Sequence, residues 1–445
     1  VLTQALKGRK LLLVGFTLFS MFFGAGNLIF PPDLGAKAGT NFWPAFLGLA
    51  ISAVGLPVAG VIAVARADGL DKLAGRVHPV FAQVFMILIY LSIGPCLAIP
   101  RTASTSFAML TPLLGSSAGL QLGYSVLFFS AAFLVALHPD RLTRWLGRLL
   151  CPCLLVLILI LFGGCLLHPL AAQYAAPTET YRSTVVLQGV LYGYQTMDAL
   201  AALPFGILVL QSVVDKGYTE SGKKFRIMSG SSILACVLLL AVYMGLAYLG
   251  ATVSAQYTSE IGRAQLVMAI VEALMGKTGM IIFGIVVGLA CVTTAVALTS
   301  SAAAYFAKLC RGKVPYKVFV IVICVFSAVV SNLGLDRIVA IAAPVLDVVY
   351  PPTLVLIFIS LVVPRLPDRI SRGAVIGALL MSVLCTLDGY GVPLTFLHKL
   401  PLFELGFAWV LPSVLFGAVT AVLPHRKEKA GKAEPACAGA NGKQG

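Results

Sequence analysis

Long stretches without a charged side chain dominate this sequence. Such runs cover residues 11–32, 38–65, 77–100, 102–139, 149–178, 227–259, 278–307, 318–335 and 405–425. A helix that crosses the hydrocarbon core of a bilayer needs about 20 mostly apolar residues, and most of these runs are at least that long. Only 11% of the residues are charged, against about 25% in soluble domains. The chain is therefore expected to be an integral membrane protein.

The spacing of these runs predicts an all-α polytopic membrane protein with twelve transmembrane helices. Their expected positions are residues 11–32, 41–64, 80–110, 122–138, 149–168, 184–210, 227–250, 279–306, 317–332, 338–363, 373–391 and 405–423. We expect a single transmembrane domain over residues 1–425, with helices 1–5 at about 11–168, helices 6–10 at about 184–363 and helices 11–12 at about 373–423. Residues 426–445 are expected to form a basic, disordered cytoplasmic tail.

The distribution of Lys and Arg predicts the orientation of these helices. Of the 32 Lys and Arg residues, 25 fall at the two ends and in every second loop. Because positive residues are retained on the cytoplasmic side, both termini are expected in the cytoplasm. The net charge of +15 is spread over short clusters rather than one basic face, so no nucleic-acid partner is expected.

Two of the predicted helices carry residues that interrupt a helix. Gly24 and Gly26 precede Asn27 in helix 1, and Gly193 precedes Asp198 in helix 6. An interruption within a membrane is tolerated only where protein or a water-filled cavity takes over the backbone hydrogen bonds. Helices five apart cross the bilayer in opposite directions, which favours an inverted five-helix repeat whose broken helices meet at the midplane. A packing face of small residues is the alternative explanation for the two glycines.

The absence of central Lys and Arg restricts the substrate. Arg101 is expected near the outer end of helix 3, so an anionic solute would have no fixed partner. The carboxylate of a zwitterion can meet the amides exposed at the break in helix 1, and its ammonium can meet open carbonyls. Aromatic and methionine side chains near the breaks can form an apolar pocket, although each alone also fits ordinary packing: Phe22, Phe23, Tyr192, Tyr194 and Met197.

Hydroxyl and carboxyl groups in three helices are candidates for handling a cation or proton. Thr293 and Thr294 can offer oxygens to a monovalent cation, or bond back to a carbonyl of their own helix. Asp198 either anchors the broken backbone or handles an ion or proton, since acids within a membrane are functional by default. Asp347, the other deeply placed acid, is either a proton or cation group or paired with a buried neighbour.

Four stretches are similar to a known family. GFTLFSMFFGAGNLIFPP at residues 15–32, GPCLAIPRTA at 94–103, YQTMDAL at 194–200 and SNLGL at 331–335 resemble the bacterial branched-chain amino acid carriers (system II, BrnQ type). The resemblance covers nearly the whole chain. It implies the amino acid, polyamine and organocation superfamily and a leucine-transporter-like fold of two inverted five-helix repeats plus two C-terminal helices. It also implies sodium-driven symport of leucine, isoleucine and valine.

The resemblance also implies residue roles. Gly24, Gly26 and Asn27 would form the unwound segment that holds the substrate carboxylate. Together with the residues around both breaks, the predicted substrate site comprises Phe22, Phe23, Gly24, Ala25, Gly26, Asn27, Tyr192, Tyr194, Thr196 and Met197. Sodium would be bound by carbonyls of Ser20, Phe23 and Ala290, by the hydroxyls of Thr293 and Thr294, and at a second site by Asn27. Asp347 departs from the superfamily pattern and leaves open a proton-coupled permease for other neutral amino acids or small zwitterions. No enzymatic motif, organic cofactor or obligate protein partner is expected.

Overall fold

The computed structural model describes residues 12, 14–137, 139–168, 170–171, 173–215, 217–218, 220–256 and 261–422. Every regular element within these residues is a helix. The predicted tail at residues 426–445 lies outside the described part of the chain.

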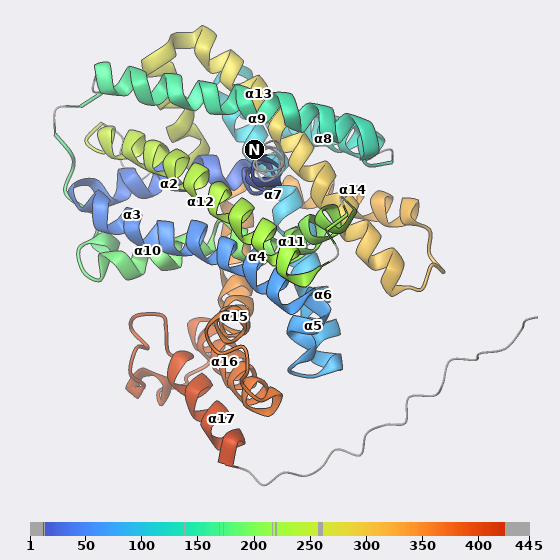
Figure 1. Ribbon diagram of the computed structural model, residues 1–445. Coiled ribbons are helices and arrows are strands. Elements are labelled where there is room, and N and C mark those ends of the chain that lie inside the picture. The colour runs from blue at the N-terminus through green and yellow to red at the C-terminus, as the bar shows by residue number, and fades with distance from the viewer. Residues whose placement is uncertain are drawn as a thin grey trace, which may run out of the picture.

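The helices follow one another along the chain, and the longest connections are residues 168–184 and 390–409 (Figure 1). After a helical stretch at residues 14–22, they are α2 (Ala25–Ala38), α3 (Phe42–Ala50), α4 (Leu56–Ala67), α5 (Leu70–Gly75), α6 (Pro79–Leu91), α7 (Ala98–Leu114), α8 (Ala118–Ala136), α9 (Pro139–Leu167), α10 (Val185–Tyr194), α11 (Asp198–Asp215), α12 (Ser221–Thr252), α13 (Arg263–Leu309), α14 (Tyr316–Ser331), α15 (Leu335–Val362), α16 (Asp368–Gly389) and α17 (Val410–Val422). Short 3₁₀ turns lie at Gly39–Asn41, Glu179–Tyr181 and Leu397–Lys399, and π-helical turns at Ile51–Gly55 and Ser92–Cys96.

Several helices have the length and apolar composition of membrane spans. Seven continuous helical stretches in the described residues meet that condition, and the bent pair α10 and α11 makes eight. Many of their large apolar side chains face outward, as with Leu127 and Ile285, which are 70% and 54% exposed. Apolar residues around the whole circumference of a helix are typical of contact with lipid. The expected all-helical membrane protein is confirmed.

Each predicted segment contains helical residues, but several of the observed elements are shorter or longer than predicted. The 42 residues from Gly26 to Ala67 run from α2 through α3 into α4, with a π-helical turn between the last two. α13 starts at Arg263, well before the predicted start at residue 279, and bends at Gly276, where φ is +65°. The C-terminal helices α16 and α17 pack side by side at one end of the molecule (Figure 1).

Close contacts at glycines hold the helices that carry the breaks. A Cβ on Gly35 of α2 would lie 1.9 Å from the Ala247 carbonyl oxygen of α12, and one on Gly48 of α3 would lie 1.9 Å from the Val186 carbonyl oxygen of α10. Only glycine permits this approach, as is common where helices pack within membranes. The packing fixes α2 on α12 and α10 on α3.

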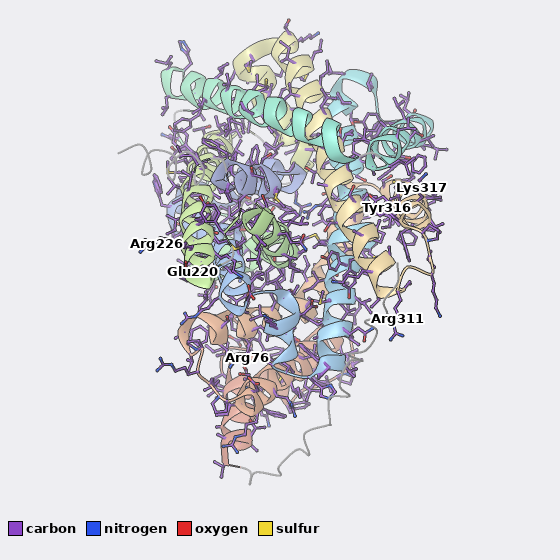
Figure 2. All side chains as sticks on the ribbon, turned by 45° about the vertical axis from the view of Figure 1, so that its right-hand side comes forward. Arg76, Glu220, Arg226, Arg311, Tyr316 and Lys317 are labelled. Carbon is purple, nitrogen blue, oxygen red and sulfur yellow. The ribbon has the colours of Figure 1, made fainter. Side chains whose placement is uncertain are left out.

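The ion pairs between loops fall into two sets, and the first set joins loops at one side of the molecule. Asp68, after α4, lies 2.6 Å from Lys224 at the start of α12. Arg76, after α5, lies 2.9 Å from Asp368 at the start of α16. These residues all belong to the loops that the charge pattern assigns to one side of the bilayer. Charged side chains such as Glu220, next to this set, lie at the periphery of the molecule (Figure 2).

The second set of ion pairs joins loops assigned to the opposite side. Arg263, at the start of α13, lies 2.6 Å from Asp336 at the start of α15 and 3.5 Å from Asp33 of α2. Lys37 lies 2.8 Å from Asp33. Since each set joins only loops of its own side, the contacts agree with alternate crossing of the bilayer.

Candidate functional site

The first break separates the helical residues 14–22 from α2. Phe23 still donates its N–H to the Phe19 carbonyl at 2.8 Å, but Gly24 has extended backbone with φ −120° and ψ −169°. The Gly24 N–H donates to Oδ1 of Asn27 at 3.3 Å, so the asparagine side chain caps the new helix. The amino end of α2 therefore begins inside the bundle, where its amides and dipole favour a negative group.

The second break separates α10 from α11, whose axes differ by 50°. Met197 lies at this break with φ +65°, a conformation that costs energy in a residue other than glycine. The Thr196 hydroxyl donates to the Gly193 carbonyl at 2.8 Å, and the Asp198 N–H donates to Oγ1 of Thr196 at 3.4 Å. Surrounding structure thus holds a strained turn, as is frequent at functional sites.

A buried carboxylate joins the two breaks. Asn27 donates its side-chain N–H to Oδ2 of Asp198 at 3.0 Å, and the Tyr243 hydroxyl of α12 donates to the same oxygen at 2.9 Å. Asn27 also hydrogen-bonds to the Tyr243 hydroxyl. All three side chains are buried, with exposed fractions of 5% or less. Asp198 therefore anchors both interrupted helices to α12, although it also borders a cavity.

Arg101 of α7 lies at the centre of the site, which corrects its expected position near the outer end of helix 3. Its side chain is 6% exposed and donates to the carbonyls of Gln195 at 2.6 Å and Thr196 at 3.0 Å. A Cβ on Gly26 would lie 2.9 Å from Nη2 of Arg101. The expectation that every span lacks a central cation is therefore wrong. The π-helical turn and the break at Gly94 in the preceding residues place the guanidinium there.

A cavity of about 50 Å³, the central cavity, lies between the two breaks. Its lining is drawn from both breaks and from α7 and α13: Met21, Phe22, Gly24, Gly26, Asn27, Ile93, Ala98, Arg101, Thr102, Thr196, Met197, Asp198, Ala201, Phe205, Thr294 and Leu298. This volume holds only a few water molecules. A solute larger than a few waters would therefore fit there only if the surrounding helices moved apart.

Some residues predicted for the substrate site do not line the central cavity. Phe23 stacks on Phe19, with ring centroids 5.3 Å apart. The Tyr192 hydroxyl hydrogen-bonds to Asp33, and Tyr194 stacks on Tyr350 at 4.2 Å. The Ala25 side chain lies outside the described part of the chain.

The predicted sodium ligands from helix 8 lie on α13. The hydroxyls of Thr293 and Thr294 both donate to the Ala290 carbonyl, at 2.8 and 3.1 Å, as the alternative explanation expected. Thr294 lines the central cavity, and a Cβ on Gly24 would lie 3.4 Å from its Cγ2. Of the two predicted threonine ligands, Thr294 is thus the one adjacent to the break before α2. Ser20 lies in the helical turn before that break.

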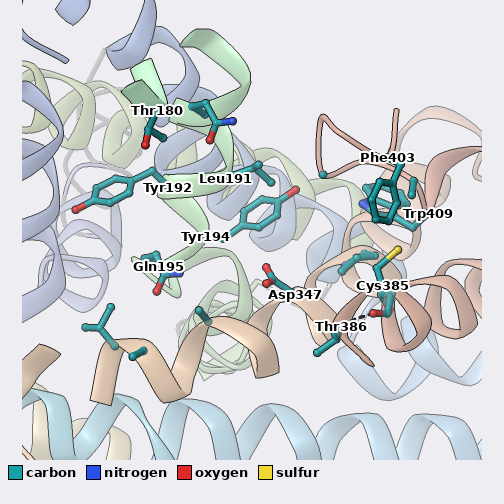
Figure 3. A pocket seen from close by; sticks show the side chains of 18 of the residues that line it. Thr180, Leu191, Tyr192, Tyr194, Gln195, Asp347, Cys385, Thr386, Phe403 and Trp409 are labelled. Atoms are coloured by element: carbon teal, nitrogen blue, oxygen red, sulfur yellow. Dashed lines mark hydrogen bonds between the residues drawn. The ribbon is translucent and has the colours of Figure 1, made fainter. Parts of the chain in front are cut away.

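Asp347 is separate from the central cavity and lies near the middle of α15. Its side chain is exposed and faces a larger cavity of about 620 Å³, the lateral cavity, bounded by α10, α15, α16 and residues 403–409 (Figure 3). No described residue forms an ion pair or hydrogen bond with its carboxylate. Pairing with a buried neighbour, one of the two predicted alternatives, is therefore not observed.

Sequence reasoning missed two residues that shape the site. Arg101 could have been found, because it is the only charged residue between positions 77 and 139, and isolated charges within membranes are generally functional. Tyr243 carried no such signal, since a tyrosine in an apolar helix is common and its partner Asp198 lies 45 residues away.

Interrupted helices that meet at a buried polar cavity are typical of secondary transporters built on broken helices. Solved structures share this fold. MhsT in complex with L-phenylalanine aligns with a TM-score of 0.53 at 17% identity, covering 92% of this chain and 97% of that protein. The inward-facing conformation of Mhp1 aligns with a TM-score of 0.57 at 12% identity, covering 91% and 90%.

Sequence comparison identifies the family within this class. The model of the branched-chain amino acid transport protein family matches residues 7–427, and the chain belongs to that family. Branched-chain amino acid permease BraB of Bacillus subtilis (strain 168) is 37% identical over 432 residues, covering 94% of this chain and 96% of the relative. The branched-chain amino acid transport system 2 carrier protein of Pseudomonas aeruginosa is 37% identical over 433 residues, covering 95% and 97%. The family consists of multi-pass membrane transporters, not enzymes, and the predicted resemblance is confirmed.

Proposed function

We propose that this protein is a sodium-coupled symporter that imports leucine, isoleucine and valine by alternating access. The observation that carries the proposal is the central cavity, where the amino end of α2, the carbonyl end of α10 and Arg101 converge. Relatives at 37% identity are named as branched-chain amino acid permeases or carriers. One polar site with both signs of charge suits a zwitterion.

The two ends of the amino acid would bind different backbone groups. Its carboxylate would lie at the amide of Gly26, since the Gly24 N–H already donates to Asn27, and would accept from Arg101, which has five N–H donors and uses two on carbonyls. Its ammonium would meet carbonyls at the break around Thr196. Its branched side chain would lie against Phe22 and Met197, which line the same cavity. The remaining residues of the predicted substrate site would act through packing around it.

Sodium would bind where Thr294 approaches Gly24, with carbonyls of Ser20, Phe23 and Ala290 as further ligands. The back-bonded hydroxyls of Thr293 and Thr294 keep lone pairs for a cation. A solved structure with a TM-score of 0.51 and 14% identity is described as a sodium-coupled sialic acid symporter. An inside-negative potential supplies about 2.3 kcal/mol per charge per 100 mV, so one sodium ion per amino acid supports accumulation.

We further propose the topology that such a carrier requires. Twelve helices would form two inverted repeats, helices 1–5 and helices 6–10, followed by two C-terminal helices. Residues 1–425 would form one domain in the bacterial inner membrane, with both termini and the basic tail in the cytoplasm. The ion pairs that join loops of one side only support this arrangement. The carrier would need no obligate protein partner.

The test is uptake of radiolabelled leucine into proteoliposomes under an inward sodium gradient, with sodium replaced by choline at matched pH and voltage. We expect uptake to require sodium and Thr294→Ala to lower the apparent sodium affinity. Leu289→Ala, a change at an exposed side chain of the same helix, is the matched control. Leucine uptake that is indifferent to sodium would refute the coupling, and absent leucine uptake would refute the substrate.

Asp198 supports a second candidate, a proton-coupled permease for other neutral amino acids or small zwitterions. Its carboxylate borders the central cavity and is buried beside Asn27 and Tyr243. In that case uptake would depend on the pH gradient in the absence of sodium and would stop in Asp198→Asn. Under sodium coupling, Asp198→Asn would lower uptake without creating or removing dependence on pH.

A further inference from the structure

The lateral cavity lies outside the site proposed for substrate and sodium, yet it is the more spacious of the two cavities. Its volume of about 620 Å³ lies in the range of small-molecule sites. Figure 3 shows the Asp347 carboxyl and the Tyr194 ring beside each other on its wall, with Phe403 and Trp409 at another side. The cavity therefore combines one carboxylate with aromatic surface.

Several polar groups on the wall of the lateral cavity have no partner within the described residues, among them Oε1 of Gln195, the Asp347 carboxylate and the Tyr194 hydroxyl. The Asp347 carboxylate is exposed to the cavity. The Tyr194 hydroxyl belongs to a side chain that is only 4% exposed, and it makes no hydrogen bond. A buried polar group without a partner costs about 1–3 kcal/mol. A ligand that donates hydrogen bonds would remove that cost.

The other charged side chains that line the cavity, those of Arg263 and Asp336, compensate each other. Arg263 pairs with Asp336 and Asp33, and Lys37 also pairs with Asp33. These four groups have no net charge, so Asp347 leaves the lateral cavity with one negative charge. The complement is a monocation, and aromatic faces such as those of Phe403 and Trp409 also attract cations.

We propose that the lateral cavity binds the primary ammonium group of a small molecule with an apolar tail. The ammonium would donate to Asp347 and to the Tyr194 hydroxyl, and the tail would lie against Phe403 and Trp409. The ligand is either the transported amino acid on its way to the central cavity or a free amine, and both present the same ammonium. Charge-assisted hydrogen bonds of this kind are the strong ones in proteins.

Cys385 provides a reporter because it lines the same cavity and is a free thiol. The full chain in lipid nanodiscs would be treated with the neutral reagent N-ethylmaleimide, and modification of Cys385 followed by peptide mass spectrometry. We expect 3-methylbutylamine to slow modification of Cys385. The carboxylate 4-methylpentanoate, which has the same apolar tail, should not.

Substitutions assign the effect to the carboxylate. Asp347→Asn should raise the amine concentration needed for protection at least tenfold. Asp347→Glu keeps a carboxylate and should protect at an amine concentration close to that of the wild type. Ser382→Ala is the matched control, because the Ser382 hydroxyl already bonds to the carbonyls of Val348 and Leu379. Rates in each variant are compared with that variant without ligand, which removes differences in thiol reactivity and folding.

The outcomes separate the two sources and the two proposals. Protection by leucine as well as by the amine would identify the transported amino acid as an occupant, whereas protection by the amine alone would identify free amines. Equal protection by 4-methylpentanoate, or protection unchanged in Asp347→Asn, would overturn the proposal. Absent leucine uptake would refute the transport function and leave protection by 3-methylbutylamine unaffected.

Discussion

Replacement of Arg101 by Gln is the sharpest test of how the central cavity recognises an amino acid. The guanidinium donates to the carbonyls of Gln195 and Thr196, at 2.6 and 3.0 Å, and is adjacent to Gly26. No described carboxylate lies within ion-pair distance of it. A substrate carboxylate would therefore be the anionic partner of a buried cation. Glutamine keeps a donor but loses the charge and the forked geometry.

The magnitude follows from the hydrogen bonds between the guanidinium and the substrate carboxylate. A hydrogen bond to a charged group contributes about 1.5–3 kcal/mol. Loss of one such bond to the substrate weakens leucine binding about tenfold to about 150-fold. Arg101→Lys retains the charge without the fork, so we expect a smaller loss. Both variants also loosen the end of α10, because Gln and Lys each carry one donor nitrogen where Arg101 uses two separate nitrogens for the two carbonyls.

Leucinamide separates recognition of the carboxylate from the effect on the helix. It has the leucine side chain and ammonium but no negative charge. Calorimetric titration of both ligands into wild-type protein and Arg101→Gln should show a large loss of affinity for leucine and little change for leucinamide. Equal losses for the two ligands would refute direct contact and leave Arg101 as a support for α10 alone.

Three further substitutions test the surroundings of the site. Gly24→Ala should fold, because its Cβ would lie 3.4 Å from Thr294, an ordinary contact distance. The variant should need at least tenfold more sodium for half-maximal leucine uptake, and unchanged sodium dependence would contradict the cation site. Tyr243→Phe removes a donor to a buried carboxylate and should lower stability by about 1.5–3 kcal/mol, seen as a lower denaturation midpoint; an unaltered midpoint would show that the bond contributes little. Gly48→Ala should reduce the yield of folded protein in size-exclusion chromatography, because its Cβ would lie 1.9 Å from a backbone oxygen. Gly163→Ala is the control, since its Cβ would meet no atom within 4 Å. Equal yields of the two variants would argue against the close helix contact.

The helices could be predicted because the bilayer imposes a simple rule on the sequence. Apolar runs of about 20 residues have few alternatives to a spanning helix. The breaks at Gly24 and at Met197 were also predictable, since glycine and polar residues within such runs violate that rule. The contact between the two breaks, made by Asn27 and Asp198, depends on tertiary packing. The sequence indicated that contact only indirectly, through the inverted repeat expected for helices five apart.

Side-chain positions within the site were harder to predict. Tyr192 and Tyr194 lie next to the break in sequence, but both side chains line the lateral cavity, and the Tyr192 hydroxyl also bonds to Asp33. Arg101 was misplaced because a helix was assumed to continue regularly from residue 80. The π-helical turn and the non-helical Gly94 rotate and shift the following residues, and hydropathy carries no information about that rotation.

The charges of the central cavity indicate which step of the proposed cycle responds to voltage. Arg101 and Asp198 contribute opposite charges, so the empty site is close to neutral. A zwitterion adds no net charge and sodium adds one, so the loaded carrier has one positive charge more than the empty one. An inside-negative potential then favours inward movement of the loaded carrier by up to about 2.3 kcal/mol per 100 mV, while return of the empty carrier is nearly independent of voltage. A proton bound at Asp198 would give the same added charge. Voltage dependence alone therefore cannot distinguish the two coupling ions, and replacement of sodium at fixed pH is the decisive comparison.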